Sequence, residues 1–279
     1  IGYIGSCPIP EVVMGINAAY LAAKSVNPNV KFKVVWVSTW FDPGKEAAAA
    51  KALVDQGADI LMQHTDSPAA MKYAEEKGVM AFGQASNMAP FGPNAQLTAI
   101  VDDWNPYYIR RVKALLDGTW KTGDVWDGIA QGTVVLAPWS PKIPADVVKL
   151  AETARDNIAK GALHPFTGPI KRQDGSVWLK DDERASDKDL LAMNFYIEGL
   201  EGALGHPDGG VGVVRAPRGD DDRLHAAGQD GPAPAARAAD LQGDEQRVAL
   251  HPLGIGEVEE RGEHEPGIGP DAGLGEVGQ

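Results

Sequence analysis

Aromatic, acidic and imidazole side chains gather in short segments that each follow an apolar run of the chain. Trp40, Phe41 and Asp42 come directly after a Val-rich run, and His64 and Asp66 come directly after the next one. Aromatic rings can stack on a planar heterocycle, while carboxylates and imidazoles can form hydrogen bonds with its edge. These residues are therefore candidates for a site that binds a flat, polar small molecule.

Three further residues extend this set of candidates. Gln84 and Ser86 follow another short apolar run, and Trp104 lies just beyond the end of the next one. An amide such as that of Gln84 donates and accepts hydrogen bonds at once, which suits the edge of a heterocycle. Loop hydrogen bonding for Gln84 and Ser86, and hinge packing for Trp104, remain open as alternatives.

The first group of candidates also has structural alternatives. Trp40 and Phe41 could pack in the core of the protein. Asp42 precedes Pro43 at an expected helix start, so capping of that helix is favoured over a ligand contact. Asp66 could belong to the cap of the following helix, and ligand contact and capping are equally supported for it.

His64 lies two residues from Asp66, and such a pair could act as base and acid in an enzyme. However, no nucleophile lies in a recognisable motif with them, and a lone histidine is more often structural. No cluster of residues has metal-ligand spacing, and no glycine-rich phosphate loop is present. The sequence predicts a binding protein without metal or cofactor, and an α/β enzyme that uses Asp66 and His64 is the alternative.

The elements that must position these residues alternate between strand and helix. Apolar runs and helical periodicity predict strands at 2–5, 31–38, 59–63, 79–83 and 97–101, and helices at 11–24, 45–55, 69–77 and 107–116. Such alternation predicts an α/β fold with a doubly wound parallel sheet. Ligands of these sheets bind beyond the carboxyl ends of the strands, where the candidate residues lie.

The remainder of the chain is expected to form less regular parts. Residues 1–102 contain enough elements for one complete α/β lobe. Residues 103–202 contribute a strand at 133–137, a helix at 144–160 and a hairpin at 168–179, which is too little for a complete second sheet. We therefore expect one complete lobe, hinge crossings and part of a second lobe.

A change in composition separates the end of the chain from the rest. From Ile197 to Gln279 there is no Lys, Ser, Thr, Asn, Cys, Met, Phe, Trp or Tyr. Such a segment cannot offset the entropy of ordering itself, so we expect residues 203–279 to be a disordered tail. This composition is also typical of a GC-rich gene read in a wrong frame, and a frameshift near Gly202 is a further hypothesis.

The charge of the chain follows the same division. Residues 201–279 hold 16 Asp or Glu against 6 Arg, which gives −10 and leaves −3 of the total −13 for residues 1–200. The part expected to fold is nearly neutral, and we expect no nucleic-acid partner. The chain opens without a basic and apolar leader and lacks a long apolar run, so it predicts no export signal and no membrane helix.

Several segments together carry a resemblance to a known family. They occur in the family's order at 2–13, 36–46, 63–67, 81–86, 97–108 and 164–171. In these segments the chain closely resembles the basic membrane protein family of ABC-transporter substrate-binding proteins. The resemblance extends from Ile1 to about Gly202.

The resemblance implies a two-lobed periplasmic-binding-protein fold of type I and a monomer without enzymatic activity. It implies an adenine-like purine base or a nucleoside as ligand, held in the cleft between the lobes, and delivery to ABC permease subunits. It also implies a location in the periplasm or at the outer face of the inner membrane, with a lipid anchor. Family members carry a signal peptide and half of the first lobe ahead of this segment, so an inactive truncated product is a second alternative.

Overall fold

The computed structural model describes residues 1–204 of the chain. Almost all of the segment expected to form a disordered or frameshifted tail, residues 203–279, therefore lies outside the described residues. Within residues 1–204, none of the helices combines the length and the apolar character that a bilayer span requires.

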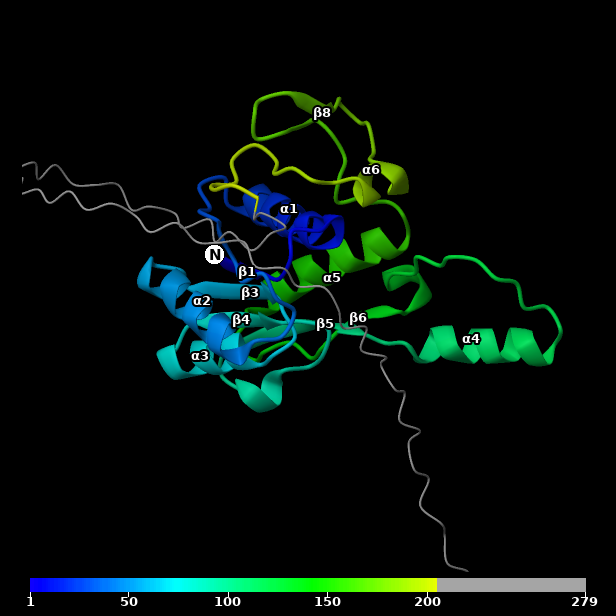
Figure 1. Cartoon of the computed structure of the whole chain (residues 1–279), viewed down its shortest axis with the longest axis horizontal. Coiled ribbons are helices and arrows are strands. Elements are labelled where there is room, and N and C mark those ends of the chain that lie inside the picture. Colours follow the sequence, from blue (N-terminus) through cyan, green and yellow to red (C-terminus); the bar gives the residue numbers. More distant parts are fainter. Residues whose placement is uncertain (205–279) are drawn as a thin grey trace, which may run out of the picture. The chain divides into compact units, whose positions relative to one another are not determined.

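A six-stranded, mostly parallel sheet forms the centre of the fold (Figure 1). Its strand order is β2-β1-β3-β4-β5-β6, and all neighbouring pairs are parallel except β5 and β6. The strands are β1 (Gly2–Gly5), β2 (Lys33–Trp36), β3 (Ile60–His64), β4 (Met80–Gly83), β5 (Gln96–Asp102) and β6 (Val134–Leu136). This arrangement confirms the predicted α/β class with its parallel sheet.

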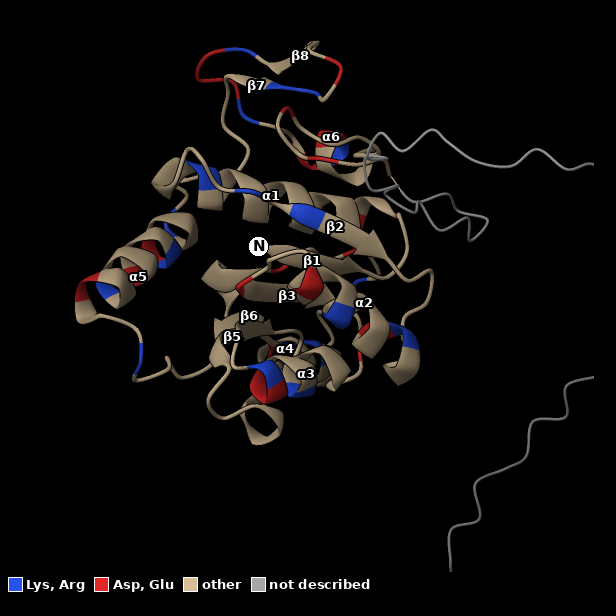
Figure 2. Ribbon diagram, turned by 90° about the vertical axis from the view of Figure 1, so that its left-hand side faces the viewer, with Lys and Arg blue, Asp and Glu red and all other residues tan. Residues whose placement is uncertain are grey.

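Helices connect the strands and cover both faces of the sheet. They are α1 (Pro10–Val26), α2 (Pro43–Asp55), α3 (Ala69–Lys77), α4 (Asn105–Leu116), α5 (Ala145–Ala159) and α6 (Asp187–Leu191). Two short 3-10 turns, Ala89–Phe91 and Ile129–Gln131, precede β5 and β6. Figure 2 shows α1 on one side of β1 and β3 and α3 on the other.

Alternation of side chains along the strands divides the core into two layers. Tyr3 packs with α1 in one cluster, whereas its neighbour Ile4 packs with residues of α2 and α3 in the other. All four residues of β1 are buried, as expected for a central strand with helices on both faces. The apolar run that opens the sequence is therefore the middle of the sheet.

The segment from 163 to 204 returns to cover α1. It contains the short hairpin β7 (Ile170–Lys171) and β8 (Val177–Leu179), which lies beyond α1 in Figure 2. Asn17 of α1 is fully buried, and its amide donates hydrogen bonds to the Phe195 carbonyl at 2.9 Å and the Met193 sulfur at 3.1 Å. The Trp36 indole donates to the Tyr196 hydroxyl at 3.0 Å.

The lobe boundary expected at residue 102 does not coincide with a break between sheets in residues 1–204. β6, which follows this boundary, pairs antiparallel with β5 and extends the same sheet. The two-lobe division and its hinge crossings stay predictions. In contrast to the other long helices before it, α4 contains no buried residue.

Candidate functional site

The carboxyl ends of β1, β2 and β3 lie side by side and bring three segments together. In the parallel register Gly5 lies opposite Trp36 on one side and His64 on the other. The loop after β2 then meets the loop after β3, because the Asp66 N–H donates to the Trp40 carbonyl at 2.9 Å. Strand order thus assembles candidates that are far apart in the sequence.

We call Trp40, His64 and Asp66 the strand-end group, and Trp40 and His64 lie at its centre. Their rings pack edge to face with centroids 5.9 Å apart, and 40% of Trp40 remains exposed. Phe41, at 62% exposure, is also outside the core. Neither residue therefore packs in the core, which was the structural alternative for both, and both side chains are partly open to solvent.

His64 also contacts a residue that the sequence analysis did not single out. Its Nε2 lies 3.5 Å from Oε1 of Glu11, which belongs to the first turn of α1. Its Nδ1 is buried and has no hydrogen-bond partner within residues 1–204. The position of Glu11, directly after the loop at the end of β1, was the available sequence signal.

Two buried hydroxyls at the same edge also lack partners. Ser6 directly follows β1 and Thr65 directly follows β3, and both residues are completely buried. Neither hydroxyl oxygen has a hydrogen-bond partner in the described part of the chain. Buried polar groups are rarely left unpaired, and exceptions gather where a water or ligand completes the structure.

Buried polar side chains hold the loop after β3 in place. The Gln63 amide donates to the carbonyls of Thr65 and Ser67 at 2.9 and 3.0 Å. The Ser67 hydroxyl donates at 2.7 Å to the buried carboxylate of Glu46 on α2. This fixed loop presents Asp66, whose exposed carboxylate has no hydrogen bond or ion pair within residues 1–204. Ser67, rather than Asp66, accepts from the backbone at the start of α3.

Asp42 caps α2, which is the alternative that the sequence favoured for it. Its carboxylate accepts from the Lys45 N–H at 3.0 Å, and its own N–H donates to Glu46 at 3.0 Å. A capping carboxylate satisfies one of the open N–H groups of a helix start. A ligand contact of Asp42 stays a prediction.

Gln84 and Ser86 form a tight turn after β4. The Ser86 N–H donates to the Gln84 carbonyl at 2.7 Å, and the residue between them, Ala85, has a φ of 57°. Ser38, in the loop after β2, has a φ of 52°. Positive φ angles at residues other than glycine are costly and concentrate at functional sites. Two of the loops at this edge therefore contain strained backbone.

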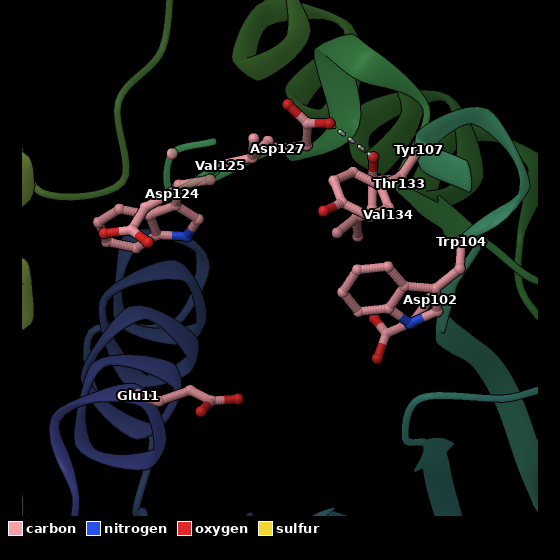
Figure 3. Close-up of a pocket in the computed structure, with 11 residues that line it drawn as sticks. Glu11, Asp102, Trp104, Tyr107, Asp124, Val125, Asp127, Thr133 and Val134 are labelled. Atoms are coloured by element: carbon pink, nitrogen blue, oxygen red, sulfur yellow. Dashed lines mark hydrogen bonds between the residues drawn. The ribbon is translucent and has the colours of Figure 1, made fainter. Parts of the chain in front are cut away.

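A cavity of about 540 Å³ adjoins the strand-end group (Figure 3). Trp104 lines it, and so do residues that the sequence analysis did not name: Glu11, Asp102, Tyr107, Gly123, Asp124, Val125, Trp126, Asp127, Thr133 and Val134. Figure 3 shows Glu11 on α1 facing Asp102 and Trp104 across the opening. Asp102 directly follows the strand predicted at 97–101, so the strand-end rule itself could have found it.

Glu11 connects the cavity with the strand-end group, and the electrostatics of Asp102 reflect this. Partial burial raises the pKa of the Asp102 carboxyl above its ordinary value, His64 lowers it, and Glu11 raises it. On the other side of the cavity, the Asp127 carboxylate pairs with Arg110.

The arrangement supplies recognition groups. Trp40, His64 and Asp66 lie together, and Trp104 lines the cavity that shares Glu11 with them. Gln84 and Ser86 follow the neighbouring strand, and Phe41 and Asp42 belong to the Trp40 loop. Within residues 1–204, no three His, Cys, Asp or Glu residues are placed to hold a metal ion together. Exposed aromatic faces beside polar groups suit the binding of a flat ligand.

Comparison with known proteins adds independent information. Residues 1–162 match the Bmp family model, described as ABC transporter substrate-binding protein PnrA-like. A purine-binding protein of Brucella abortus is 59% identical over 203 residues, which are 73% of this chain and 58% of that protein. A relative in Haloferax volcanii, named as an ABC transporter glucose-binding protein, is 35% identical over 204 residues, which are 73% of this chain and 50% of the relative.

Among solved structures, a transcriptional activator of the comK gene from Bacillus halodurans is similar in fold. It is 21% identical, with a TM-score of 0.52, and the match covers 59% of this chain and 58% of that one. At this identity the likeness concerns the fold alone. The chain spans about half the length of the curated relatives it matches. Because the family model covers 162 of 279 residues, the chain belongs to the Bmp family of PnrA-like ABC transporter substrate-binding proteins.

Proposed function

We propose that this chain binds a purine base or nucleoside as part of an extracytoplasmic solute-binding protein of an ABC importer. The observation that carries the proposal is the strand-end group, where the exposed ring of Trp40 lies beside His64 and Asp66. A purine offers two flat faces for stacking and an edge of hydrogen-bond donors and acceptors. Side chains suited to both kinds of contact lie at this edge of the sheet.

Each candidate residue has a role in this proposal. Trp40 and Trp104 supply ring faces for stacking, with Phe41 as a further apolar contact. Asp66, His64, Gln84 and Ser86 supply donors and acceptors to the edge of the ligand, and Asp42 holds the start of α2 in place. The buried hydrogen bonds of Gln63 and Glu46 keep the loop of Asp66 ordered before binding, which reduces the entropic cost of association.

Family membership and the Brucella abortus relative support a transport role. A substrate-binding protein captures its ligand and presents it to the permease of the transporter, so binding without chemical change is the expected activity. We propose that this occurs in the periplasm or at the outer face of the inner membrane, by a monomer. The family and this relative are substrate-binding proteins rather than enzymes.

Titration calorimetry on the purified chain tests the proposal. Adenine, adenosine, guanosine and hypoxanthine are titrated separately, with glucose included because of the name of the Haloferax volcanii relative. We expect saturable binding of at least one purine with a Kd in the micromolar range, roughly −8 kcal/mol. Saturation by glucose alone would show that the ligand is a sugar rather than a purine. Absence of binding by all of these ligands would favour the alternative that the chain is an inactive truncated product.

A pair of tryptophan variants shows whether binding uses this site. Trp40→Ala removes the ring beside His64, and loss of one stacked aromatic costs about 1 kcal/mol or more, so Kd should rise roughly fivefold or more. Trp120→Ala is the matched control, because Trp120 is similarly exposed at 47% but lies beyond the end of α4, where it contacts Arg111 of that helix. Equal losses in both variants would place the ligand elsewhere.

The enzyme alternative is tested with the same samples. Adenosine is incubated with the chain, and free adenine is measured by chromatography. Accumulation of adenine that His64→Ala and Asp66→Ala abolish would establish turnover and overturn the binding-protein proposal. Adenosine that stays intact while it binds supports it.

A further inference from the structure

The cavity beside the strand-end group is lined by acidic side chains and by no basic ones. Four of the residues that line it carry carboxylates, namely Glu11, Asp102, Asp124 and Asp127. None of the lining residues is Lys, Arg or His. Only Asp127 is neutralised by a strong base, since Arg110 pairs with it from outside the lining. The side of the cavity formed by Glu11 and Asp102 has no such partner.

Glu11 and Asp102 face one another across the opening of the cavity, and no Lys or Arg is among the residues that line it (Figure 3). Within residues 1–204, the only charge partner of Glu11 is the imidazole of His64 at 3.5 Å, and Asp102 has no ion pair or side-chain hydrogen bond. Partial burial raises the pKa of the Asp102 carboxyl, His64 lowers it and Glu11 raises it, and the net direction is upward, so the ionised form of Asp102 is disfavoured where it lies. A ligand that brings donors or positive charge would relieve this repulsion.

The remaining walls of the cavity are aromatic. Trp104, Tyr107 and Trp126 line it, and Trp104 packs edge to face against Tyr107 with centroids 5.7 Å apart. Aromatic faces attract cations and the positive edges of amine-bearing rings, and they accommodate flat groups. Aromatic walls and unpaired carboxylates therefore favour the same kind of ligand.

We propose that Glu11 and Asp102 select flat heterocycles that carry an exocyclic amine or positive charge, and that they exclude anionic ones. This inference rests on the proposed function, because it names the chemical class of purine that the site takes. Amine-bearing purines donate to the two carboxylates. An anionic purine meets two like charges at the opening of the cavity, and both repel it.

Two comparisons of ligands at neutral pH test the proposal by calorimetry. Adenine against unsubstituted purine isolates the amine, since the ring system is the same. Adenine against urate, an anion at neutral pH, adds the effect of charge. We expect adenine to bind at least tenfold more tightly than purine, and urate to bind more weakly than both.

Variants of the two carboxylates connect this selectivity to the cavity. Glu11→Gln and Asp102→Asn, singly and together, keep the shape of the side chains and remove their charge. In the double variant the ratio of the urate Kd to the adenine Kd should therefore fall at least threefold. Asp103→Asn is the matched control, because Asp103 precedes Trp104 but only caps Asn105 and does not line the cavity. Thermal unfolding of each variant checks that it is folded.

The outcomes separate this inference from the proposed function. Binding of adenine, purine and urate with similar Kd overturns the selectivity but leaves the purine site intact. A strong preference for adenine that survives in the double variant also overturns it, because shape would then be responsible. Absence of binding by every purine overturns the proposed function itself, and this inference with it.

Discussion

Single residues at the carboxyl edge of the sheet differ in whether their buried polar groups have partners. Glu46 is completely buried and is satisfied by the Ser67 hydroxyl and the Asp42 N–H, so it serves the framework of the loops. His64, in contrast, retains a buried Nδ1 without a partner in the described residues. The difference distinguishes groups that hold the site from groups that remain available to a ligand.

The raised pKa of Asp102 predicts a stability that depends on pH. The folded chain holds this proton more tightly than the unfolded chain, so the contribution is present at low pH and is lost as pH rises through the folded pKa. Asp102→Asn removes the charge, and we expect the Tm to rise by about 1 °C at pH 7.5, a small effect because the residue is exposed.

Calorimetric unfolding of both proteins at pH 7.5 and at about pH 3, below the ordinary pKa of an Asp carboxyl, measures this difference. At the lower pH, protonated Asp102 is neutral like the amide, so the two Tm values should converge. Asp103→Asn provides the comparison for a neighbouring carboxylate. A constant Tm difference at both pH values would contradict the assigned electrostatics.

Asp42 allows capping and ligand contact to be separated. Asp42→Ala removes the acceptor for the Lys45 N–H and should lower the free energy of unfolding by about 1 kcal/mol, whereas Asp42→Asn retains a capping oxygen and should cost little. Urea unfolding measures both variants. If Asp42→Asn keeps its stability but loses adenine affinity in calorimetry, Asp42 contacts the ligand as well as the helix.

At the scale of elements, the connection between α1 and the returning segment 163–204 depends on a buried amide. Asn17 donates to Phe195 and accepts from the Ile197 N–H at 3.3 Å, and it is separated from them in sequence by almost the whole described chain. Its replacement would leave two backbone groups without partners in the core. Contacts of this kind join the beginning and the end of the described residues 1–204 into one folded unit.

Asn17→Leu should therefore lower the free energy of unfolding by about 2 kcal/mol, because each orphaned buried group costs roughly 1–3 kcal/mol and the apolar side chain offsets part of this. Urea unfolding measures the loss, and limited proteolysis should cut within 163–204 earlier than in the wild type. Asn29→Leu, at an exposed loop position, is the control. Unchanged proteolysis would show that the segment is held by other contacts.

At the scale of the whole molecule, the uneven covering of the sheet is the main feature. The helices next to β1 and β3 bury their apolar residues, whereas five large apolar side chains of α4 are more than half exposed: Tyr108, Ile109, Val112, Leu115 and Leu116. Contiguous apolar patches of this kind favour association between molecules. The described fold therefore has one well-covered part and one apolar face at α4.

The chain is proposed to act as a monomer at the low concentrations of the binding assays; as its concentration rises, we expect weak self-association through this exposed face of α4. The pair Val112→Glu and Leu116→Lys leaves the net charge unchanged and sets an ion pair at helical spacing, so it should reduce association without unfolding α4. Sedimentation velocity measures the effect. Val26→Glu with Leu191→Lys, at exposed apolar positions outside α4, is the control, and equal effects of both pairs would exclude α4 as the contact.

The sequence was informative where local pattern and physical cause coincide. Strands β1 to β5 and helices α1 to α4 lie where periodicity and the cap at Asp42 predicted them. The strand-end rule also located the residues that meet there, since Trp40, His64 and Asp66 come from segments that it selected. Glu11 was missed because it looks like any acidic residue in the first turn of a helix.

By itself, the sequence determined the α/β class and the family, because these depend on periodicity and on short segments read in order, and it predicts the edge of the sheet at which we propose the site. Only the tertiary structure decided that Glu11 faces His64 and Asp102, and that β6 joins the same sheet. Strand order and helix packing set which distant side chains meet, and no local pattern encodes those distances.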